Sequence, residues 1–227
     1  MACSWRWRRL RRADAVSVHL PTLEGQRCTL RPLRETDAPS LQRHADDPLV
    51  AQSLLDGFPQ PYTLAHAQAW CGPQHLQPAF AHVLGVVVAQ DEVAGCISVT
   101  PEGGMWACSA VVGYWLGQVH WRKGVMSEAL ALTTAWAWSE LPSTTRIWAP
   151  IFASNVASQG VAAKAGYVLE GRMPRSILKS GQAIDAVMMA CYRPADLLSS
   201  DSLADRLRRF DPARHAGESP SAPANRS

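Results

Sequence analysis

Hydrophobic and polar positions alternate along several stretches of this chain, and elsewhere the hydrophobic residues recur at helical spacing. Alternation predicts strands, whereas a period near 3.6 residues predicts helices. Strands are expected at 25–32, 82–90, 93–100, 110–116, 146–152, 167–170 and 184–192. Helices are expected at 36–45, 63–71, 127–140 and 155–165. Hairpins are therefore followed by strand–helix–strand units, which predicts an α/β (mixed α+β) protein. Its mixed, mostly antiparallel twisted sheet should have about six to seven strands, with helices on both faces.

Turn and cap residues separate these elements. Residues 91–92 and 103–104 each predict a turn between two strands. Thr63 is placed to cap the helix that follows it, and Gly166 is a typical helix-ending residue. Residues 46–62 contain several Pro and Gly and are expected to be part loop and part short helix.

The two ends of the chain differ from its middle. Residues 1–17 hold an Arg-rich run without an apolar segment, which predicts a basic flexible arm rather than a secretory signal. Residues 196–227 predict a short helix at about 202–210 and then a disordered tail, because Pro, Ala, Ser and Gly dominate there. One folded domain is therefore expected over residues 18–195.

Composition narrows the function classes. Hydrophobic residues make up 47% of the 227 residues and charged residues 18%, which supports a real core. The formal net charge of +3 comes from the basic arm, so a nucleic-acid binder is disfavoured. An RNA- or ribosome-associated protein that docks through the arm stays as an alternative. No apolar run is long enough to predict a membrane span.

Cysteine and histidine usage predicts neither a disulfide framework nor a metal centre. The six cysteines form no CxxC pair, and His75, His82 and His120 are scattered along the sequence. Neutral thiols in a reducing cytoplasm are the favoured interpretation.

Candidate chemistry is concentrated where the strand ending at Leu116 leads into the helix near Ser127. Between them lie two cations and a glycine, Arg122, Lys123 and Gly124. Free amide N–H groups in the first turn of a helix, together with the helix dipole, favour an anion such as phosphate. The alternative is a solvated basic pair beside a turn glycine.

Several short sequence motifs occur in a fixed order along the chain and together resemble a known family. They are GYWLG at 113–117; Trp121, Lys123, Gly124, Ser127, Glu128 and Ala129; Asn155 and Ser158; Lys164, Gly166 and Tyr167; Glu170 and Gly171; and Asp185. Together they resemble the GNAT superfamily of N-acetyltransferases, in its branch of ribosomal-protein-alanine N-acetyltransferase (RimJ/RimL-like) relatives. The resemblance covers about residues 18–195.

This resemblance implies the GNAT fold, acetyl-CoA as co-substrate and acetyl transfer to a primary amine by direct attack in a ternary complex. The acceptor would be a protein N-terminus or a small-molecule amine. The strand would pair with the pantetheine arm, the loop amides would hold the pyrophosphate, and Asn155 would bind the pantetheine. Ser158 would lie beside the thioester sulfur. The implied cofactor residues are Tyr114, Trp115, Leu116, Arg122, Lys123, Gly124, Val125, Met126, Ser127, Asn155 and Ser158.

Two departures from the superfamily affect catalysis. Ala162 stands where many members carry a tyrosine that protonates the leaving thiolate, so Ser158 is the expected substitute. Pro150 stands where some relatives carry a basic carboxylate, which leaves ordered water or Asp185 to take the amine proton. Structural roles are the alternatives: Ser158 as a first-turn serine that satisfies helix N–H groups, and Asp185 as a turn anchor.

The acceptor is expected opposite the cofactor, lined by Phe58, Tyr62, Trp70 and Trp106, each of which could instead be core. A non-catalytic acetyl-CoA-binding regulatory module is the second hypothesis, because the usual acid and base are absent. The protein is expected to be a monomer or homodimer, without a metal.

Overall fold

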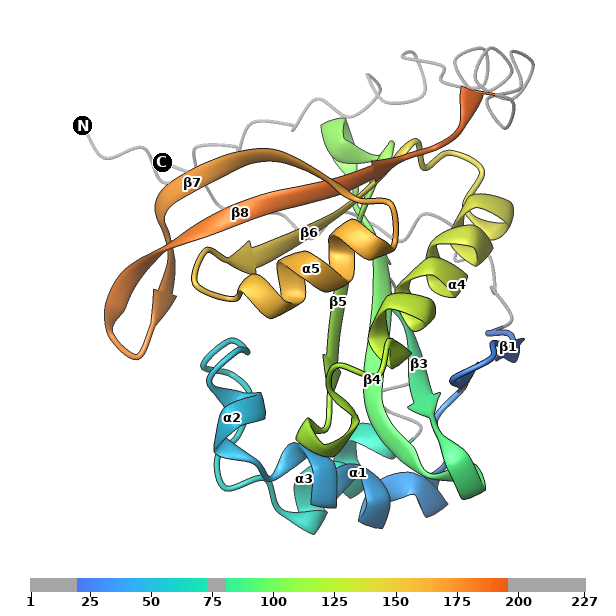
Figure 1. The fold of residues 1–227 in the computed structure, drawn as a ribbon. Coiled ribbons are helices and arrows are strands. Elements are labelled where there is room, and N and C mark those ends of the chain that lie inside the picture. Colours follow the sequence, from blue (N-terminus) through green and yellow to red (C-terminus); the bar gives the residue numbers. More distant parts are fainter. Residues whose placement is uncertain (1–19, 73–80, 196–227) are drawn as a thin grey trace, which may run out of the picture.

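The computed structural model describes residues 20–72 and 81–195, which form one eight-stranded sheet with helices packed on it (Figure 1). The strand order is β1-β2-β3-β4-β5-β6-β8-β7. The strands are β1 (Leu23–Glu24), β2 (Thr29–Arg31), β3 (His82–Val87), β4 (Val93–Pro101), β5 (Ser109–Leu116), β6 (Arg146–Phe152), β7 (Val168–Lys179) and β8 (Gln182–Tyr192). The helices are α1 (Ala38–Ala45), α2 (Pro48–Ala51), α3 (Leu64–Cys71), α4 (Val125–Glu140) and α5 (Val156–Lys164).

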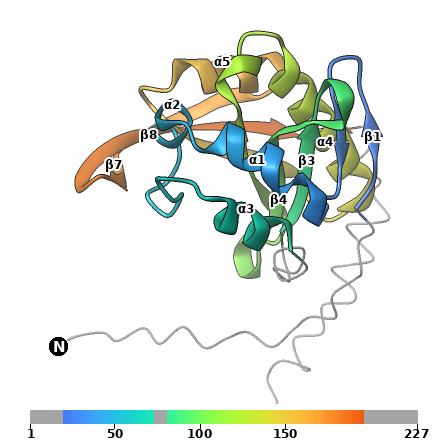
Figure 2. The same ribbon diagram turned by 90° about the horizontal axis from the view of Figure 1, so that it is seen from below.

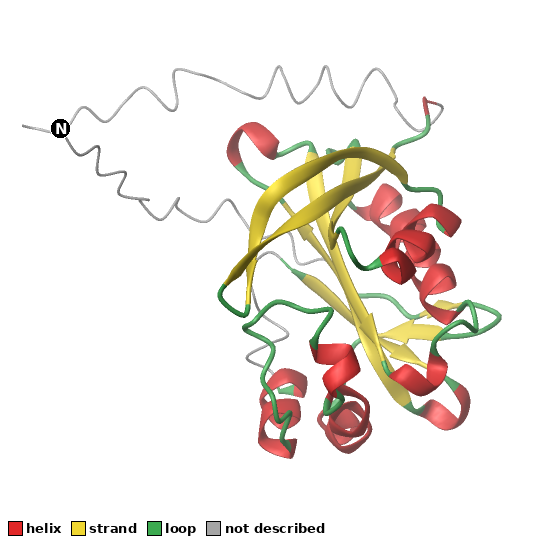
Figure 3. Cartoon of the chain, turned by 60° about the vertical axis from the view of Figure 1, so that its left-hand side comes forward, coloured by secondary structure: helices red, strands yellow, loops and turns green. Residues whose placement is uncertain are grey.

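One strand pair differs from the others in direction. The described neighbours in the sheet run antiparallel except β5 and β6, which are parallel. The sheet is strongly twisted (Figure 3), and the long β7–β8 hairpin forms one edge. The mixed, mostly antiparallel sheet expected from the sequence is confirmed, with one strand more than the upper expectation.

Alternating side chains in the strands divide the core between the two faces of the sheet. In β3, Leu84 and Val86 pack with α4 and α5, whereas Val83 and Val87 pack with α1 and α3. Figure 2 shows α1 and α3 side by side on their face, seen from below. Helices on both faces are therefore confirmed, and the period-2 pattern of the strands is the physical cause.

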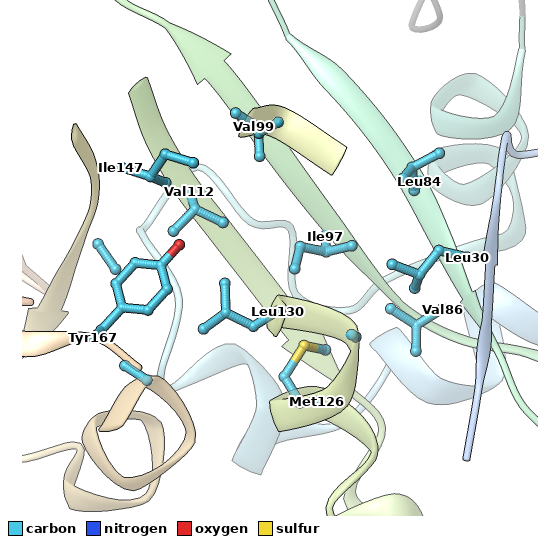
Figure 4. Packing of buried hydrophobic residues seen from close by; sticks show 14 of the residues in the cluster. Leu30, Leu84, Val86, Ile97, Val99, Val112, Met126, Leu130, Ile147 and Tyr167 are labelled. Atoms are coloured by element: carbon cyan, nitrogen blue, oxygen red, sulfur yellow. The ribbon is translucent and has the colours of Figure 1, made fainter. Parts of the chain in front are cut away.

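The larger cluster lies under α4, where Leu130 is fully buried among strand residues (Figure 4). Tyr167 is buried in the same cluster, and its hydroxyl lies 2.9 Å from the hydroxyl of Thr134. Residues labelled in the figure are Leu30, Leu84, Val86, Ile97, Val99, Val112, Met126, Leu130, Ile147 and Tyr167. This packing holds the start of α4 firmly against the end of β5.

Two expected strands differ from the structure. The run at 25–32 is interrupted, because residues 25–28 form a turn between β1 and β2 in which the N–H of Gly25 donates to the carbonyl of Cys28 at 2.9 Å. The strand expected at 167–170 is instead β7, which continues to Lys179. Most of β7 is exposed on both faces, so its sequence does not alternate between hydrophobic and polar residues, and the pattern did not reveal the full strand.

The expected arm at 1–17 and the expected helix and tail at 196–227 lie outside the described residues. In the described part of the chain, the five cysteines are free thiols. No helix in that same part has the length and apolar character needed to cross a membrane.

Candidate functional site

The parallel strands β5 and β6 separate after a short paired segment (Figure 1). Pairing joins Ser109–Val111 to Arg146–Trp148 and stops there, although both strands continue. On its other edge, β5 stays paired with β4 from Ala110 to Leu116. The second half of β5 therefore has one backbone edge that faces a gap between two strands.

Hydrogen-bond alternation decides which residues face this gap. The N–H of Gly117 donates to the carbonyl of Ala94 at 2.8 Å, so these two residues form a hydrogen-bonded pair. Along an antiparallel ladder, hydrogen-bonded and non-hydrogen-bonded pairs alternate. By that alternation the backbone of Trp115 faces β4, while Tyr114 and Leu116 face the gap. This geometry leaves the backbone of Tyr114 and Leu116 available for the expected pantetheine pairing, whereas the backbone of Trp115 is directed toward β4.

The carbonyl of Leu116 already has a partner. The indole Nε1–H of Trp121 donates to it at 2.7 Å. Trp121 therefore closes the loop that follows β5, which gives this residue a structural role. The N–H of Leu116 and both backbone groups of Tyr114 remain on the gap side.

Helix α4 begins directly after a left-handed glycine. Gly124 has φ +78° and precedes Val125, the first helical residue, two positions before the expected start. A residue with a Cβ rarely adopts this conformation, and a Cβ here would also lie 3.2 Å from Nε of Arg27. The first-turn amides have no partner within the helix and carry the positive end of its dipole. The side chains of Val125 and Met126 are buried, which leaves their backbone for a ligand.

A basic depression of about 480 Å³ lies at this helix start. The predicted cations Arg122 and Lys123 line it together with two that sequence reasoning did not assign, Arg27 and Lys164. Its lining residues are Arg27, Arg122, Lys123, Gly124, Ser127, Glu128, Ala131 and Lys164. Four cations and free amides in one hollow favour a multiply charged anion such as a diphosphate.

Glu128 fixes the turn that brings Arg27 into this hollow. Its carboxylate accepts the backbone N–H groups of Gln26, Arg27 and Cys28 at 3.0, 2.7 and 3.1 Å. Burial opposes ionisation of Glu128, but these hydrogen bonds outweigh it and hold its pKa below the ordinary range. Burial, with Glu128 nearby, raises the pKa of the Cys28 thiol to about 12. Glu128 is therefore a positioning residue that holds the turn at 26–28 against the start of α4.

Ser158 and Tyr114 hydrogen-bond to each other across the gap. The hydroxyl of Ser158 donates to the Tyr114 hydroxyl at 3.0 Å, which donates in turn to the carbonyl of Ser158 at 3.1 Å. Burial raises the pKa of Tyr114, and the bond from Ser158 partly offsets this rise. The ring of Tyr114 was not singled out as a proton-carrying group in the sequence, since only α5 packed on β5 brings it to Ser158.

Asn155 caps helix α5. Its Oδ1 accepts the N–H of Ser158 at 3.0 Å, so the capping role considered for Ser158 belongs to Asn155. The side-chain nitrogen Nδ2 of Asn155 donates to no described residue and is the atom left for a ligand.

Asp185 is held by two arginines of the β7–β8 hairpin. Its carboxylate accepts the N–H of Arg175 at 2.8 Å and Nε–H of Arg172 at 2.9 Å. These contacts hold the pKa of Asp185 below its ordinary range, which weakens it as a base. The geometry therefore favours the turn-anchoring alternative for this residue.

The aromatic residues expected at the acceptor separate into two places. Phe58 stacks on Tyr62 with ring centroids 5.0 Å apart and meets the edge of Trp115 at 5.9 Å. Trp106 is exposed and precedes β5, whose first residue, Ser109, lies about 20 Å along the strand from Trp115. Trp106 therefore lies outside this aromatic cluster. Trp70 packs against the same hydrophobic cluster as Phe58 and Trp115.

The tip of the β7–β8 hairpin contacts the loop after α2, beside Phe58. The ammonium of Lys179 donates to the carbonyls of Ala51 and Leu54 at 3.3 and 2.7 Å and pairs with Asp56 at 3.0 Å. The N–H of Ser180 donates to the same Asp56 at 2.7 Å. This clasp, which the sequence did not indicate, joins two segments far apart in the chain next to the aromatic cluster.

Comparison with known proteins agrees with this geometry. Residues 27–168 match the family model described as an acetyltransferase (GNAT) domain, which is more than half of the chain. The chain belongs to the GNAT acetyltransferase family. A probable N-acetyltransferase, YjcK of Bacillus subtilis, is 26% identical over 186 residues, which is 77% of this GNAT chain and 98% of the relative.

Solved structures share the fold. RimJ of Mycobacterium smegmatis, in complex with CoA-disulfide, has a TM-score of 0.68 at 21% identity and covers 83% of this chain and 96% of its own. RimL, a ribosomal L7/L12 alpha-N-protein acetyltransferase in complex with coenzyme A, has a TM-score of 0.65 at 23% identity over 76% and 98%. These likenesses establish the GNAT fold of this chain.

Proposed function

We propose that this GNAT protein transfers the acetyl group of acetyl-CoA to a primary amine. The observation that carries the proposal is the basic hollow at the start of α4, which adjoins the unpaired edge of β5. The hollow supplies cations and free amides that can bind a diphosphate. The edge of β5 supplies backbone donors and acceptors that can hydrogen-bond an extended chain containing amides. Acetyl-CoA has both chemical groups in that order.

Each part of the cofactor would meet a different element. The amides that follow Arg122, together with the cations of the hollow, would hold the pyrophosphate. The backbone of Tyr114 and the N–H of Leu116 would pair with the pantetheine amides, and Nδ2 of Asn155 would donate to the same arm. The thioester would then lie near Ser158, where one strand N–H could donate to its carbonyl oxygen.

The acetyl transfer itself requires few catalytic groups from the protein. The neutral amine nitrogen attacks the thioester carbon, a C–N bond forms, and the C–S bond breaks to release the CoA thiolate. The amine proton leaves to water, and the thiolate takes a proton from Ser158 or from water. Ser158 donates to the Tyr114 hydroxyl at 3.0 Å, so a relay of a proton from Tyr114 to Ser158 would require this hydrogen bond to reverse its direction. Positioning of the two reactants would supply most of the rate enhancement.

A protein N-terminus is our first candidate for the acceptor, and a small-molecule amine is the second. The acceptor would enter beside Phe58 and Tyr62, between the α2 loop and the β7–β8 hairpin that Lys179 joins. The RimL and RimJ folds support the first candidate, because RimL is described as an alpha-N-protein acetyltransferase. Peptides that differ only in a free or a blocked N-terminus would separate the α-amine from side-chain amines.

The test combines calorimetry with a turnover assay on the full chain. Titration with acetyl-CoA and then CoA should give micromolar binding, and thiol release should follow when a panel of peptides and small amines is added. No binding at millimolar acetyl-CoA would refute the proposed cofactor site. Binding without turnover of any amine would refute the transferase proposal alone.

A non-catalytic acetyl-CoA-binding module is the second candidate. This candidate is favoured because the candidate acid and base already have hydrogen-bond partners within the protein. Ser158 and Tyr114 bond to each other, and Asp185 is paired with Arg172. The turnover assay separates the two functions, because the module would bind acetyl-CoA and release thiol no faster than buffer.

A further inference from the structure

Three metal-ligating side chains from separate segments converge beside the loop between β5 and α4. His44 comes from the end of α1, Glu92 from the turn before β4, and His120 from the short 3-10 turn at Gln118–His120. Each offers one ligand atom, and these atoms lie within 4.8 Å of one another. The two imidazole rings meet edge to face with centroids 5.2 Å apart. Sequence spacing gave no sign of this cluster, because its members are far apart in the chain.

One nitrogen of the cluster is buried without a partner. Nε2 of His120 has no hydrogen-bond partner among the described residues. Buried polar atoms are nearly always paired, so such a nitrogen points to a bound water or ion. Nε2 of His44 lies 3.0 Å from Oε1 of Glu92, which is close to the separation of about 3.3 Å between two ligands of a tetrahedral zinc ion.

We propose that His44, Glu92 and His120 form a binding site for a divalent transition metal ion of the zinc class. Two imidazoles and one carboxylate are a ligand set that zinc accepts, with water in the fourth position. The ion would lie between Nε2 of His44 and Oε1 of Glu92 in place of their hydrogen bond, with His44 binding as a neutral imidazole that carries its proton on Nδ1. His120 would close the remaining distance by up to about 1.5 Å, through a side-chain rotation in a partly exposed turn.

The position of the site suggests what the metal would do. His120 lies two residues before Arg122 and four before Gly124, in the loop that presents the free amides of α4. A metal would fasten this loop to α1 and to the start of β4. Its expected effect is a more stable protein and a better-ordered anion site, and it does not depend on acetyl transfer.

The test uses cobalt(II) as a visible probe with the full, chelator-treated chain. Cobalt should bind one to one, give the intense visible bands of a tetrahedral site, and be displaced by zinc. His120→Asn and Glu92→Gln should each weaken binding about 100-fold or more, since even outer partners of metal ligands contribute 10–100-fold. His66→Gln is the matched control, because His66 lies outside the cluster on α3 and should leave binding unchanged.

A further variant tests the site while all three proposed metal ligands stay in place. Arg43 donates to Oε1 of Glu92 at 2.9 Å and so competes with a cation for that oxygen. Arg43→Gln should therefore tighten cobalt and zinc binding several-fold while the metal-free protein keeps its circular dichroism spectrum.

Three outcomes would overturn the proposal. Absence of stoichiometric cobalt binding would do so, and equal affinity in all four variants would show that the metal binds elsewhere. A sulfur-to-cobalt charge-transfer band would assign the metal to a cysteine instead.

Discussion

The two ends of the gap between β5 and β6 are built differently. At the α4 end, the amides after Gly124 and the cations of the basic hollow have few partners of their own. At the α5 end, Ser158 and Tyr114 bond to each other and Asn155 caps its helix. One end is therefore open for a ligand, whereas the other is internally satisfied.

This difference separates binding from proton transfer. Fixed amides and cations hold an anion without any rearrangement, so the α4 end needs only the ligand. A proton from Ser158 can reach a leaving thiolate only if its bond to Tyr114 is exchanged or relayed. We therefore expect changes at the α4 end to act on the dissociation constant, and changes at the α5 end to act on turnover.

The largest effect is expected at Gly124. Gly124→Glu combines a strained backbone, a Cβ contact with Arg27 and a negative charge at the anion site. Acetyl-CoA affinity should fall at least about 100-fold by calorimetry, a loss of roughly 3 kcal/mol. Gly124→Ala carries the strain without the charge and should lose much less. Normal binding by Gly124→Glu would mean that the pyrophosphate lies elsewhere.

Removing the hydroxyl of Ser158 should act on turnover. If Ser158 gives the proton to the thiolate, Ser158→Ala should lower kcat about 100-fold, with little change in KM for acetyl-CoA. Tyr114→Phe should lower kcat less, because water can still reprotonate Ser158. Thr134→Val is the matched control, since it removes a hydroxyl that bonds Tyr167 within the core. An unchanged kcat in Ser158→Ala would assign the proton transfer to water.

The two cations that the sequence did not assign should have a moderate effect. Arg27→Gln and Lys164→Gln should each weaken acetyl-CoA binding about tenfold at low salt, and the loss should shrink as salt rises. Arg34→Gln serves as the control, because Arg34 pairs with Asp91 and does not line the hollow. Equal affinity in all variants would limit the anion site to the helix amides.

The smallest effect is expected at Glu128, and it depends on pH. Its pKa in the folded protein lies below the ordinary value of 4.5, so its stabilising effect is present at neutral pH and is lost as the pH falls below about 4.5. Glu128→Gln should lower the free energy of unfolding at pH 7 by about 1 kcal/mol, because Gln keeps one acceptor oxygen, and the difference should narrow in acid. Denaturant unfolding at several pH values measures this. A constant difference across pH would exclude the carboxylate charge as the cause.

Several features of this protein are determined by residues close to one another in the sequence. The alternation in β3 and β4 and the cap at Thr63 each depend on neighbours a few residues away, and both were predicted. The motif pieces from GYWLG to Asp185 likewise identified the GNAT family and the helix start that faces the anion hollow. Short-range backbone and side-chain preferences are sufficient to predict the elements and caps, whereas the family came from the resemblance of the ordered motifs.

Other features exist only once the sheet has formed. Arg27 enters the hollow because Glu128, a hundred residues later, accepts the amides around it. Packing of α5 on β5 brings Tyr114 to Ser158, and the hairpin reaches the α2 loop through Lys179. The sequence did not indicate the surroundings of Trp115 and Trp106, because strand register and strand length, not residue type, set them. Local sequence determined the elements and the family, whereas long-range pairing decided which charges and hydroxyls meet, because those contacts join segments that no local preference connects.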